Sequence, residues 1–216
     1  MVPAAGSGRR GRAPLGGPEA DLRAQGHAWV AGVDEVGRGP LAGPVVAAAV
    51  MLPAGWADPG VDDSKRLTAS RRRALAIDIA ATAASWALGL VEAAEVDRLN
   101  IHHASLLAMR RAVEALAWRP DFLLVDGRFA LEMDIAQRAV VGGDATCPSV
   151  AAASILAKVH RDGVMAAWHR EYPAYNFAAN KGYATLEHRQ ALARRGPCPL
   201  HRRSFAPVAQ LELGLV

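Results

Sequence analysis

Cysteine is scarce in this chain, with only Cys147 and Cys198 among 216 residues. Two widely separated cysteines provide neither a disulfide framework nor the paired spacing of a zinc-binding knuckle. The chain also lacks an uninterrupted apolar run long enough to cross a membrane. The first 26 residues lack the apolar core of a secretory signal. These absences predict a cytoplasmic protein with free thiols and no membrane association.

A strong excess of one charge is missing as well. The net charge is +4, and residues 27–216 carry 21 basic against 19 acidic side chains. Nucleic-acid binding would therefore depend on local basic patches, because the chain has no global positive field. Residues 1–26 are rich in Gly, Ala, Pro and Arg, which predicts a disordered tail. The remaining length suits one domain with a sizeable core, over residues 27–216.

Several familiar catalytic motifs are absent. The glycine-rich stretch 37–43 lacks the Gly-Lys-Ser/Thr ending of a phosphate-binding P-loop, and its spacing differs from the dinucleotide fingerprint. The chain has no Gly-x-Ser-x-Gly nucleophile elbow. His102 and His103 are adjacent, so they cannot both face one side of a helix. We expect them at the surface or in packing rather than as zinc ligands.

What the chain does contain is a series of short apolar runs. The first three runs follow one another and the later ones alternate with helical patterns, which predicts a mixed sheet with helices on its faces. Only a Gly- and Pro-containing turn separates the first two runs, so they are expected to be antiparallel neighbours. Strands are predicted at 28–33, 44–52, 85–91, 122–125 and 135–141, helices at 69–81, 95–100, 102–117, 148–172 and 186–195, and a loop at 175–183.

Acidic residues stand at the ends of three of these runs. Asp34 and Glu35 follow the first run and precede a Gly-Arg-Gly loop. Asp126 follows the fourth run, and Asp144 lies just past the fifth. Each acid alone is compatible with a polar turn, but ligands gather at the carboxyl ends of strands in open α/β sheets. If the carboxylates converge, their repulsion requires divalent cations, and oxygen-only ligands favour Mg²⁺ or Mn²⁺ over zinc.

Seven motifs occur in a fixed order along the chain. Through them the chain resembles bacterial ribonuclease HII, from about Trp29 to Val208. The resemblance implies an RNase H-like α/β fold, with a central five-stranded mixed sheet flanked by helices and a helical C-terminal part. The motifs are VDEVGRGPLAGPVV, DDSKRLT, LNIHHAS, LLVDG, GGDATCPSVAAASILAKVHRD, NKGYAT and HRRSFAPV.

The same resemblance implies a metal-dependent endoribonuclease of the ribonuclease H type. Its substrates would be RNA–DNA hybrids and duplex DNA with single embedded ribonucleotides, as in ribonucleotide excision repair. Two-metal-ion hydrolysis would leave a 3′-hydroxyl and a 5′-phosphate. The protein would act as a monomer, and whether it binds a replication clamp is left open. One alternative is an RNase H-like DNA nuclease of the resolvase or transposase type. A second alternative is an inactive hybrid-binding module, but the presence of all four acids argues against it.

Site residues are carried over from the motifs position by position. The catalytic and metal-binding acids implied are Asp34, Glu35, Asp126 and Asp144. The loop implied to contact the ribose is Gly37, Arg38 and Gly39, and the implied junction-sensing residue is Tyr183. From their types and places, further substrate contacts are expected from Lys65, Ser154, Lys158 and Lys181, with a phosphate-binding or electrostatic contribution from Arg161, Arg194, Arg195, His201, Arg202 and Arg203.

Two positions depart from the family pattern. Gly142 stands where a lysine usually precedes the glycine before the fourth acid. Asn180 stands where a histidine usually precedes Lys181, Gly182 and Tyr183. Neither change removes a proposed metal ligand, but both are expected to alter how tightly the phosphate backbone is held.

Overall fold

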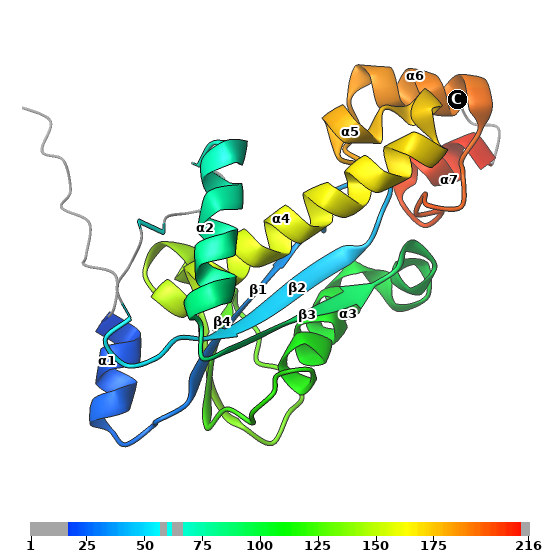
Figure 1. Ribbon diagram of the computed structural model, residues 1–216. Coiled ribbons are helices and arrows are strands. Elements are labelled where there is room, and N and C mark those ends of the chain that lie inside the picture. Colours follow the sequence, from blue (N-terminus) through cyan, green and yellow to red (C-terminus); the bar gives the residue numbers. More distant parts are fainter. Residues whose placement is uncertain (1–16, 57–59, 62–66, 213–216) are drawn as a thin grey trace, which may run out of the picture.

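A five-stranded mixed sheet forms the centre of this computed structural model, which describes residues 17–56, 60–61 and 67–212 (Figure 1). The spatial order of the strands is β3-β2-β1-β4-β5, with β1 antiparallel to β2 and parallel to β4. The predicted mixed sheet and the antiparallel first pair are confirmed. The strands are β1 (Val30–Val36), β2 (Val45–Met51), β3 (Ser85–Val91), β4 (Phe122–Asp126) and β5 (Ala136–Val140).

Helices cover both faces of the sheet (Figure 1). Helix α3 (Ala93–Glu114) packs on one face, and α2 (Ala69–Thr82) and α4 (Pro148–Glu171) pack on the other. Thr68 caps α2, because its hydroxyl accepts a hydrogen bond from the N–H of Arg71 at 3.3 Å. The C-terminal part gathers beside the end of α4 and contains α5 (Phe177–Asn180), α6 (Leu186–Arg195) and α7 (Ala206–Glu212).

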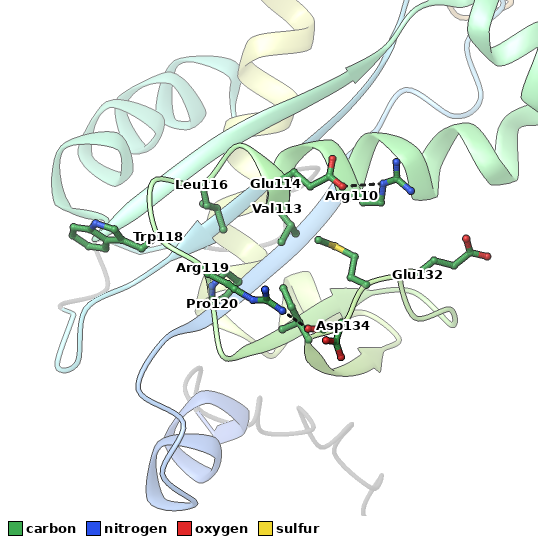
Figure 2. Close-up of a pocket in the computed structure, with 11 residues that line it drawn as sticks. Arg110, Val113, Glu114, Leu116, Trp118, Arg119, Pro120, Glu132 and Asp134 are labelled. Carbon is green, nitrogen blue, oxygen red and sulfur yellow. Dashed lines mark hydrogen bonds and ion pairs between the residues drawn. The ribbon is translucent and has the colours of Figure 1, made fainter.

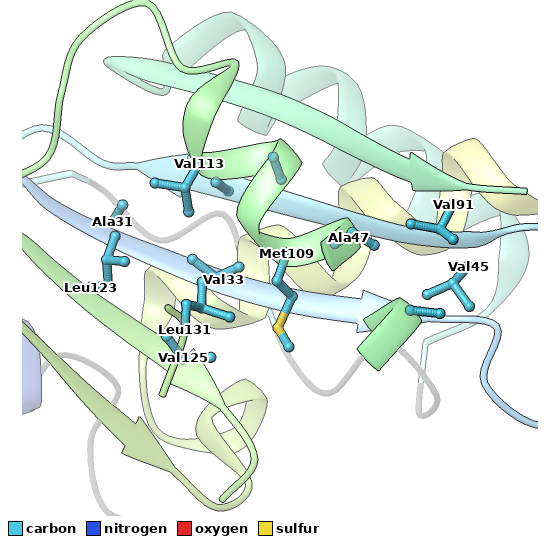
Figure 3. Packing of buried hydrophobic residues seen from close by; sticks show 14 of the residues in the cluster. Ala31, Val33, Val45, Ala47, Val91, Met109, Val113, Leu123, Val125 and Leu131 are labelled. Atoms are coloured by element: carbon cyan, nitrogen blue, oxygen red, sulfur yellow. The ribbon is translucent and has the colours of Figure 1, made fainter. Parts of the chain in front are cut away.

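Strand β2 is buried on both faces of the sheet. Its successive side chains point to opposite faces, so they enter two different hydrophobic clusters. Val45 and Ala47 pack in the cluster that includes Met109 of α3 (Figure 3). Val46 and Ala48 pack in the opposite cluster, with α2 and α4. Burial of each valine stabilises the fold by about 1.5–3 kcal/mol. This two-sided core fixes the strands that carry the acidic residues.

The structure corrects the predicted disordered tail. Helix α1 (Gly17–Ala24) lies inside that segment, and its Leu22 is buried. The Oε1 atom of Glu19 accepts hydrogen bonds from the amide and hydroxyl of Ser149, at 3.0 and 2.7 Å, in the first turn of α4. A carboxylate at that end of a helix satisfies its N–H groups and interacts favourably with its dipole. The prediction from composition did not detect that Leu22 and Glu19 anchor this segment. Residues 1–16 lie outside the described residues.

Smaller differences concern element boundaries. The predicted helices 95–100 and 102–117 join into α3 across a kink at Asn100, where φ is 64°. The predicted loop 175–183 contains the short helix α5. Cys147 and Cys198 are free, as expected from their count, and both are buried. Within the described ranges, none of the helices combines the length and the hydropathy needed to span a membrane.

Candidate active site

Two acidic residues lie at the same height at the carboxyl ends of β1 and β4. Val33 pairs with Val125 in parallel register, and Asp34 and Asp126 are the next residues on their strands. Val33 and Val125 both pack in the cluster with α3. Because successive side chains alternate between faces, Asp34 and Asp126 point to the other face, where α4 lies. The parallel register therefore brings the two predicted acids together.

Asp34 holds its carboxyl group in a buried position. Its Oδ1 atom accepts the N–H of Glu35 at 2.7 Å, and the hydroxyl of Ser154 on α4 also hydrogen-bonds to it. Burial, followed by the charges of Glu35 and Asp126, raises the pKa of Asp34 well above its usual value. Ionisation of Asp34 is thus unfavourable unless a positive charge compensates it.

Arg38 compensates part of the charge of the neighbouring acid, Glu35. Its Nη1 atom lies 3.2 Å from Oε1 of Glu35, while about half of the Arg38 side chain stays exposed. Burial raises the pKa of Glu35, and the hydrogen bond and charge of Arg38 oppose that rise. The charge of Asp126 adds to the rise. Three predicted acids, Asp34, Glu35 and Asp126, therefore act on one another within one site.

Asp144 reaches the same end of the sheet through a different element. It lies in the short 3₁₀ helix η1 (Gly143–Ala145), between β5 and α4, and is buried. The N–H of Gly143 donates to Oδ1 of Asp126 at 2.8 Å, which ties the segment of Asp144 to β4. Over the described residues, no three His, Cys, Asp or Glu side chains already form a group that could hold a metal ion. Their role as metal ligands therefore stays a prediction.

The predicted ribose loop and the predicted junction-sensing tyrosine lie against each other. The N–H of Leu41 donates to the carbonyl of Gly182 at 2.8 Å. A Cβ atom placed on Gly39 would lie 3.5 Å from Cε1 of Tyr183, so the ring faces Gly39 across the space that a small side chain would fill. Tyr183 is 46% exposed, which leaves ring surface for a ligand. Two segments that are far apart in sequence thus form one surface.

The two residues that depart from the family pattern, Asn180 and Gly142, each fit the local backbone. Asn180 is buried, its Nδ2 donates to the carbonyl of Tyr175 at 2.6 Å, and its Oδ1 accepts the N–H of Gly182 at 2.8 Å. Asn180 therefore holds the backbone that precedes Tyr183. Gly142 precedes η1 with φ 70° and ψ 36°, a left-handed conformation in which lysine is unfavourable. The local backbone at this position suits glycine.

The predicted phosphate-binding lysines have partners within the protein. Nζ of Lys158 lies 2.6 Å from Oδ1 of Asp162, one turn later on α4. Nζ of Lys181 donates to the carbonyl of Ala178 at 2.6 Å. Lys65 lies outside the described residues. Substrate contacts by these lysines and by Ser154 stay predictions.

Three residues of the predicted basic surface are buried, which corrects their expected role. Arg161 and Arg202 are fully buried and His201 is 2% exposed, whereas the three remaining arginines of the set are exposed. The sequence did contain a signal for Arg161. It lies four residues after Ala157 and four before Met165, both fully buried, so helical spacing puts it on the inward side of α4.

A cavity of about 470 Å³ lies away from these residues (Figure 2). The end of α3, the connection to β4 and the segment before β5 line it, so it lies at the amino ends of β4 and β5. Its rim holds an ion pair between Arg110 and Glu114, at 3.2 Å. The candidate acids are at the opposite ends of these strands, and the cavity is not part of their site.

Sequence and fold both match known proteins. The sequence model of the Ribonuclease HII family matches residues 31–208. The protein named Ribonuclease HII in Myxococcus xanthus is 54% identical over 198 residues, which are 91% of this chain and 67% of that protein. The one in a Polaromonas species is 56% identical over 182 residues, 84% of this chain and 92% of that protein. The crystal structure of ribonuclease H2 from Pyrococcus horikoshii superimposes with a TM-score of 0.76 at 26% identity, over 87% of this chain and 98% of that chain.

Proposed function

The chain belongs to the ribonuclease HII family, and from that premise we propose that it also incises beside single ribonucleotides embedded in duplex DNA. Family membership makes it a ribonuclease H, which acts on the RNA strand of RNA–DNA hybrids. The match of the family model and of the relatives confirms the predicted family. The fold match confirms the RNase H-like architecture. The family match disfavours a DNA nuclease of the resolvase or transposase type.

The placement of Tyr183 opposite the Gly37–Gly39 loop supports this finer specificity. Gly39 and Tyr183 face a common space, and Arg38 beside them is paired with the acid Glu35. A nucleotide whose phosphate reaches the acids would therefore have its sugar next to the loop backbone. The 2′-hydroxyl can donate and accept hydrogen bonds, so main-chain groups suffice to recognise it. The ring of Tyr183 would pack on the neighbouring deoxyribose, where a second 2′-hydroxyl would crowd it.

The four acids fit a site for divalent cations. We propose that Asp34, Glu35, Asp126 and Asp144 hold two ions, Mg²⁺ or Mn²⁺, through carboxylate oxygens. The raised pKa of Asp34 marks a buried carboxyl group whose ionised form a cation would stabilise. Such ions promote attack by water on the phosphodiester and stabilise the charge that develops, which would leave a 3′-hydroxyl and a 5′-phosphate.

The other side chains would orient the site. Ser154 holds Asp34 through its hydroxyl, which keeps one carboxylate aligned on β1. Arg38 is exposed enough to turn from Glu35 to a phosphate, where a guanidinium binds strongly. Lys158 and Lys181 lie on segments that border the site and would contact the phosphate backbone, as would Lys65.

The test compares three substrates: a duplex DNA with one ribonucleotide, a continuous RNA–DNA hybrid and an all-DNA duplex. We expect cleavage of the first two in Mg²⁺ or Mn²⁺, none with chelator, and none of the all-DNA duplex. Asp34→Asn should abolish both activities, because the amide keeps the shape and loses the charge. Asp78→Asn, an exposed carboxylate on α2, is the matched control and should leave both rates unchanged.

Each outcome separates one part of the proposal. Cleavage of the hybrid without incision at a single ribonucleotide would leave the family activity intact and refute the finer specificity. Full turnover by Asp34→Asn would refute the site assignment. Cleavage of all-DNA duplex would favour a DNA nuclease.

A further inference from the structure

The loop that holds Gly37, Arg38 and Gly39 folds around a buried guanidinium. Arg202, from the HRRSF segment before α7, is fully buried and donates five hydrogen bonds to four main-chain carbonyls. The donor–acceptor distances run from 2.6 to 3.1 Å. The accepting residues are Gly37, Arg38, Pro40 and Gly43.

This pattern determines which way the peptide groups of the loop face. In a trans peptide the carbonyl and the following N–H point in opposite directions. Because the carbonyls of Gly37 and Arg38 point inward to Arg202, the N–H groups of Arg38 and Gly39 point away from it. Outward N–H groups on successive residues form a concave donor surface suited to phosphate or sugar oxygens. Arg202 therefore orients the donors of the loop without reaching the surface itself.

Arg161 connects the same loop to the Tyr183 segment. From α4, its Nε donates to the carbonyl of Pro44 at 3.0 Å, and its Nη2 donates to that of Ala42 at 3.1 Å. Its Nη1 donates to the carbonyl of Lys181 at 3.0 Å. One fully buried side chain thus spans both segments. A guanidinium suits this task because its planar fork holds several acceptors at fixed angles.

Two glycines in these segments leave no room for a side chain, one against the facing segment and the other against Arg161. A Cβ on Gly182, where φ is +85°, would lie 2.4 Å from the carbonyl oxygen of Ala42. A Cβ on Gly37, where φ is +94°, would lie 2.3 Å from Nε of Arg161. On the far side, Nδ1 of His188 hydrogen-bonds to the carbonyl of Tyr183 at 2.8 Å. The loop, the tyrosine segment and the two arginines form one packed unit.

We propose that Arg161 and Arg202 are positioning residues that lock the Gly37–Gly39 backbone against the Lys181–Tyr183 segment, so that the sugars on both sides of the cleaved bond are recognised by one rigid surface. Neither arginine touches substrate. Their basic character serves the protein backbone, although the sequence places them among candidate phosphate ligands. This inference rests on the proposed recognition of single ribonucleotides.

The test uses Arg161→Lys in the full chain. Lysine keeps the charge, but one ammonium cannot span three carbonyls in fixed geometry. We expect the ratio of kcat/KM on the single-ribonucleotide duplex to kcat/KM on the continuous hybrid to fall by about tenfold, through the loss of one or two hydrogen bonds. Amide hydrogen exchange should become faster in both 37–43 and 181–183. Arg170→Lys, exposed on the same helix, is the matched control and should change neither measurement.

A second variant covers the case in which Arg161→Lys does not fold. Gly182→Ala keeps both arginines and pushes the segments apart, so the same fall in the ratio is expected. Equal losses on both substrates, or unchanged hydrogen exchange in both variants, would overturn the inference. Tyr183→Ala distinguishes the proposed specificity from the proposed role of the arginines. If this variant leaves the ratio unchanged, the proposed specificity itself fails. If it lowers the ratio and the positioning variants do not, only the role of the arginines fails.

Discussion

Arginine serves two purposes around the candidate site. The Arg38 side chain is about half exposed and pairs with a carboxylate, whereas Arg202 is fully buried among main-chain carbonyls. Burial, with the nearby charge of Arg161, lowers the pKa of Arg202 to about 9. Arg202 thus tolerates an unfavourable environment because its five donors are satisfied. The hydrogen-bond and ion-pair partners of each arginine therefore indicate its role better than the residue type does.

Asp34→Asn should stabilise the protein in the absence of divalent cations while it removes activity. The pKa of Asp34 is raised in the folded state, so folding is penalised once the pH exceeds the unfolded value of 3.8. The variant should therefore gain melting temperature at pH 7, by roughly 2–4 °C for each kcal/mol gained when the burial and the repulsion of the Asp34 charge are removed. The gain should vanish well below pH 3.8, where Asp34 is protonated in both the folded and the unfolded state. Calorimetry with chelator at both pH values measures it; a gain independent of pH would contradict the charge explanation.

Tyr183→Ala should weaken incision at a single ribonucleotide more than cleavage within continuous RNA. In the proposed mode of recognition the ring packs on a deoxyribose at the junction, and a continuous RNA strand makes that contact poorly, so it has less to lose. Base-stacking contacts are worth roughly 1–3 kcal/mol, which corresponds to about tenfold to hundredfold in rate. Rates on both substrates at one salt concentration decide it, with Tyr183→Phe as the ring-retaining control. Equal losses would indicate general binding or packing.

At the scale of elements, the C-terminal part serves as a support for the loop and for Tyr183. Two buried histidines lie at its centre, His188 of α6 and His201, with their Nε2 atoms 3.0 Å apart. Nδ1 of His201 faces the amide and thiol of Cys198, and the ring packs on Tyr175. Burial and the neighbouring His188 lower the pKa of His201 to about 4. Both rings are accommodated only while at least one of them is neutral.

Acid should therefore loosen this part of the molecule. A histidine whose folded pKa lies below its unfolded value of 6.5 destabilises the fold progressively as the pH falls from 6.5 to about 4. One such site changes the free energy of unfolding by up to about 1.4 kcal/mol per pH unit. Urea unfolding between pH 7 and 4 should show this slope, and His201→Gln should reduce it. Asp34 titrates with the opposite sign, so the comparison is best made in the Asp34→Asn background.

The elements show how far the sequence could predict the fold. Apolar runs located β3 at its observed bounds, and Thr68 and Gly196 marked the ends of their helices, because these signals are local. The strand-end acids were predicted together because parallel register is a property of the fold class. The burial of Arg202 could not be predicted, since its partners lie at 37–43. The kink at Asn100 likewise depends on tertiary packing.

At the scale of the whole molecule, α1 joins the sheet to the start of α4. Its Leu22 is 1% exposed and its Glu19 contacts Ser149, yet α1 precedes the segment matched by the family model. Helix α4 carries Ser154 and follows the segment of Asp144 directly. Helix α1 therefore contributes to the placement of the acids from outside the family match.

Leu22→Ala should lower the free energy of unfolding by about 2–5 kcal/mol, as is usual for a buried leucine. Removal of residues 1–24 should cost at least as much, because the contact of Glu19 is lost too. Ile77→Ala, on a side chain that is 71% exposed on α2, is the control and should change little. Urea denaturation measures all three. An unchanged midpoint for the truncated chain would mean that α1 does not hold the fold together.

The hydrogen bonds of Arg202 have a consequence for how the protein is made. They join a loop near the start of the chain to a residue close to its end, across sequence separations of 159 to 165 residues. A ribosome synthesises the loop early and supplies Arg202 among the last residues of the domain. Contacts between such distant residues also form slowly during folding, because a long chain segment must close first. A nascent chain can therefore assemble its sheet before the proposed sugar-recognising surface exists, and the proposed specificity for single ribonucleotides would arise only after Arg202 has been synthesised.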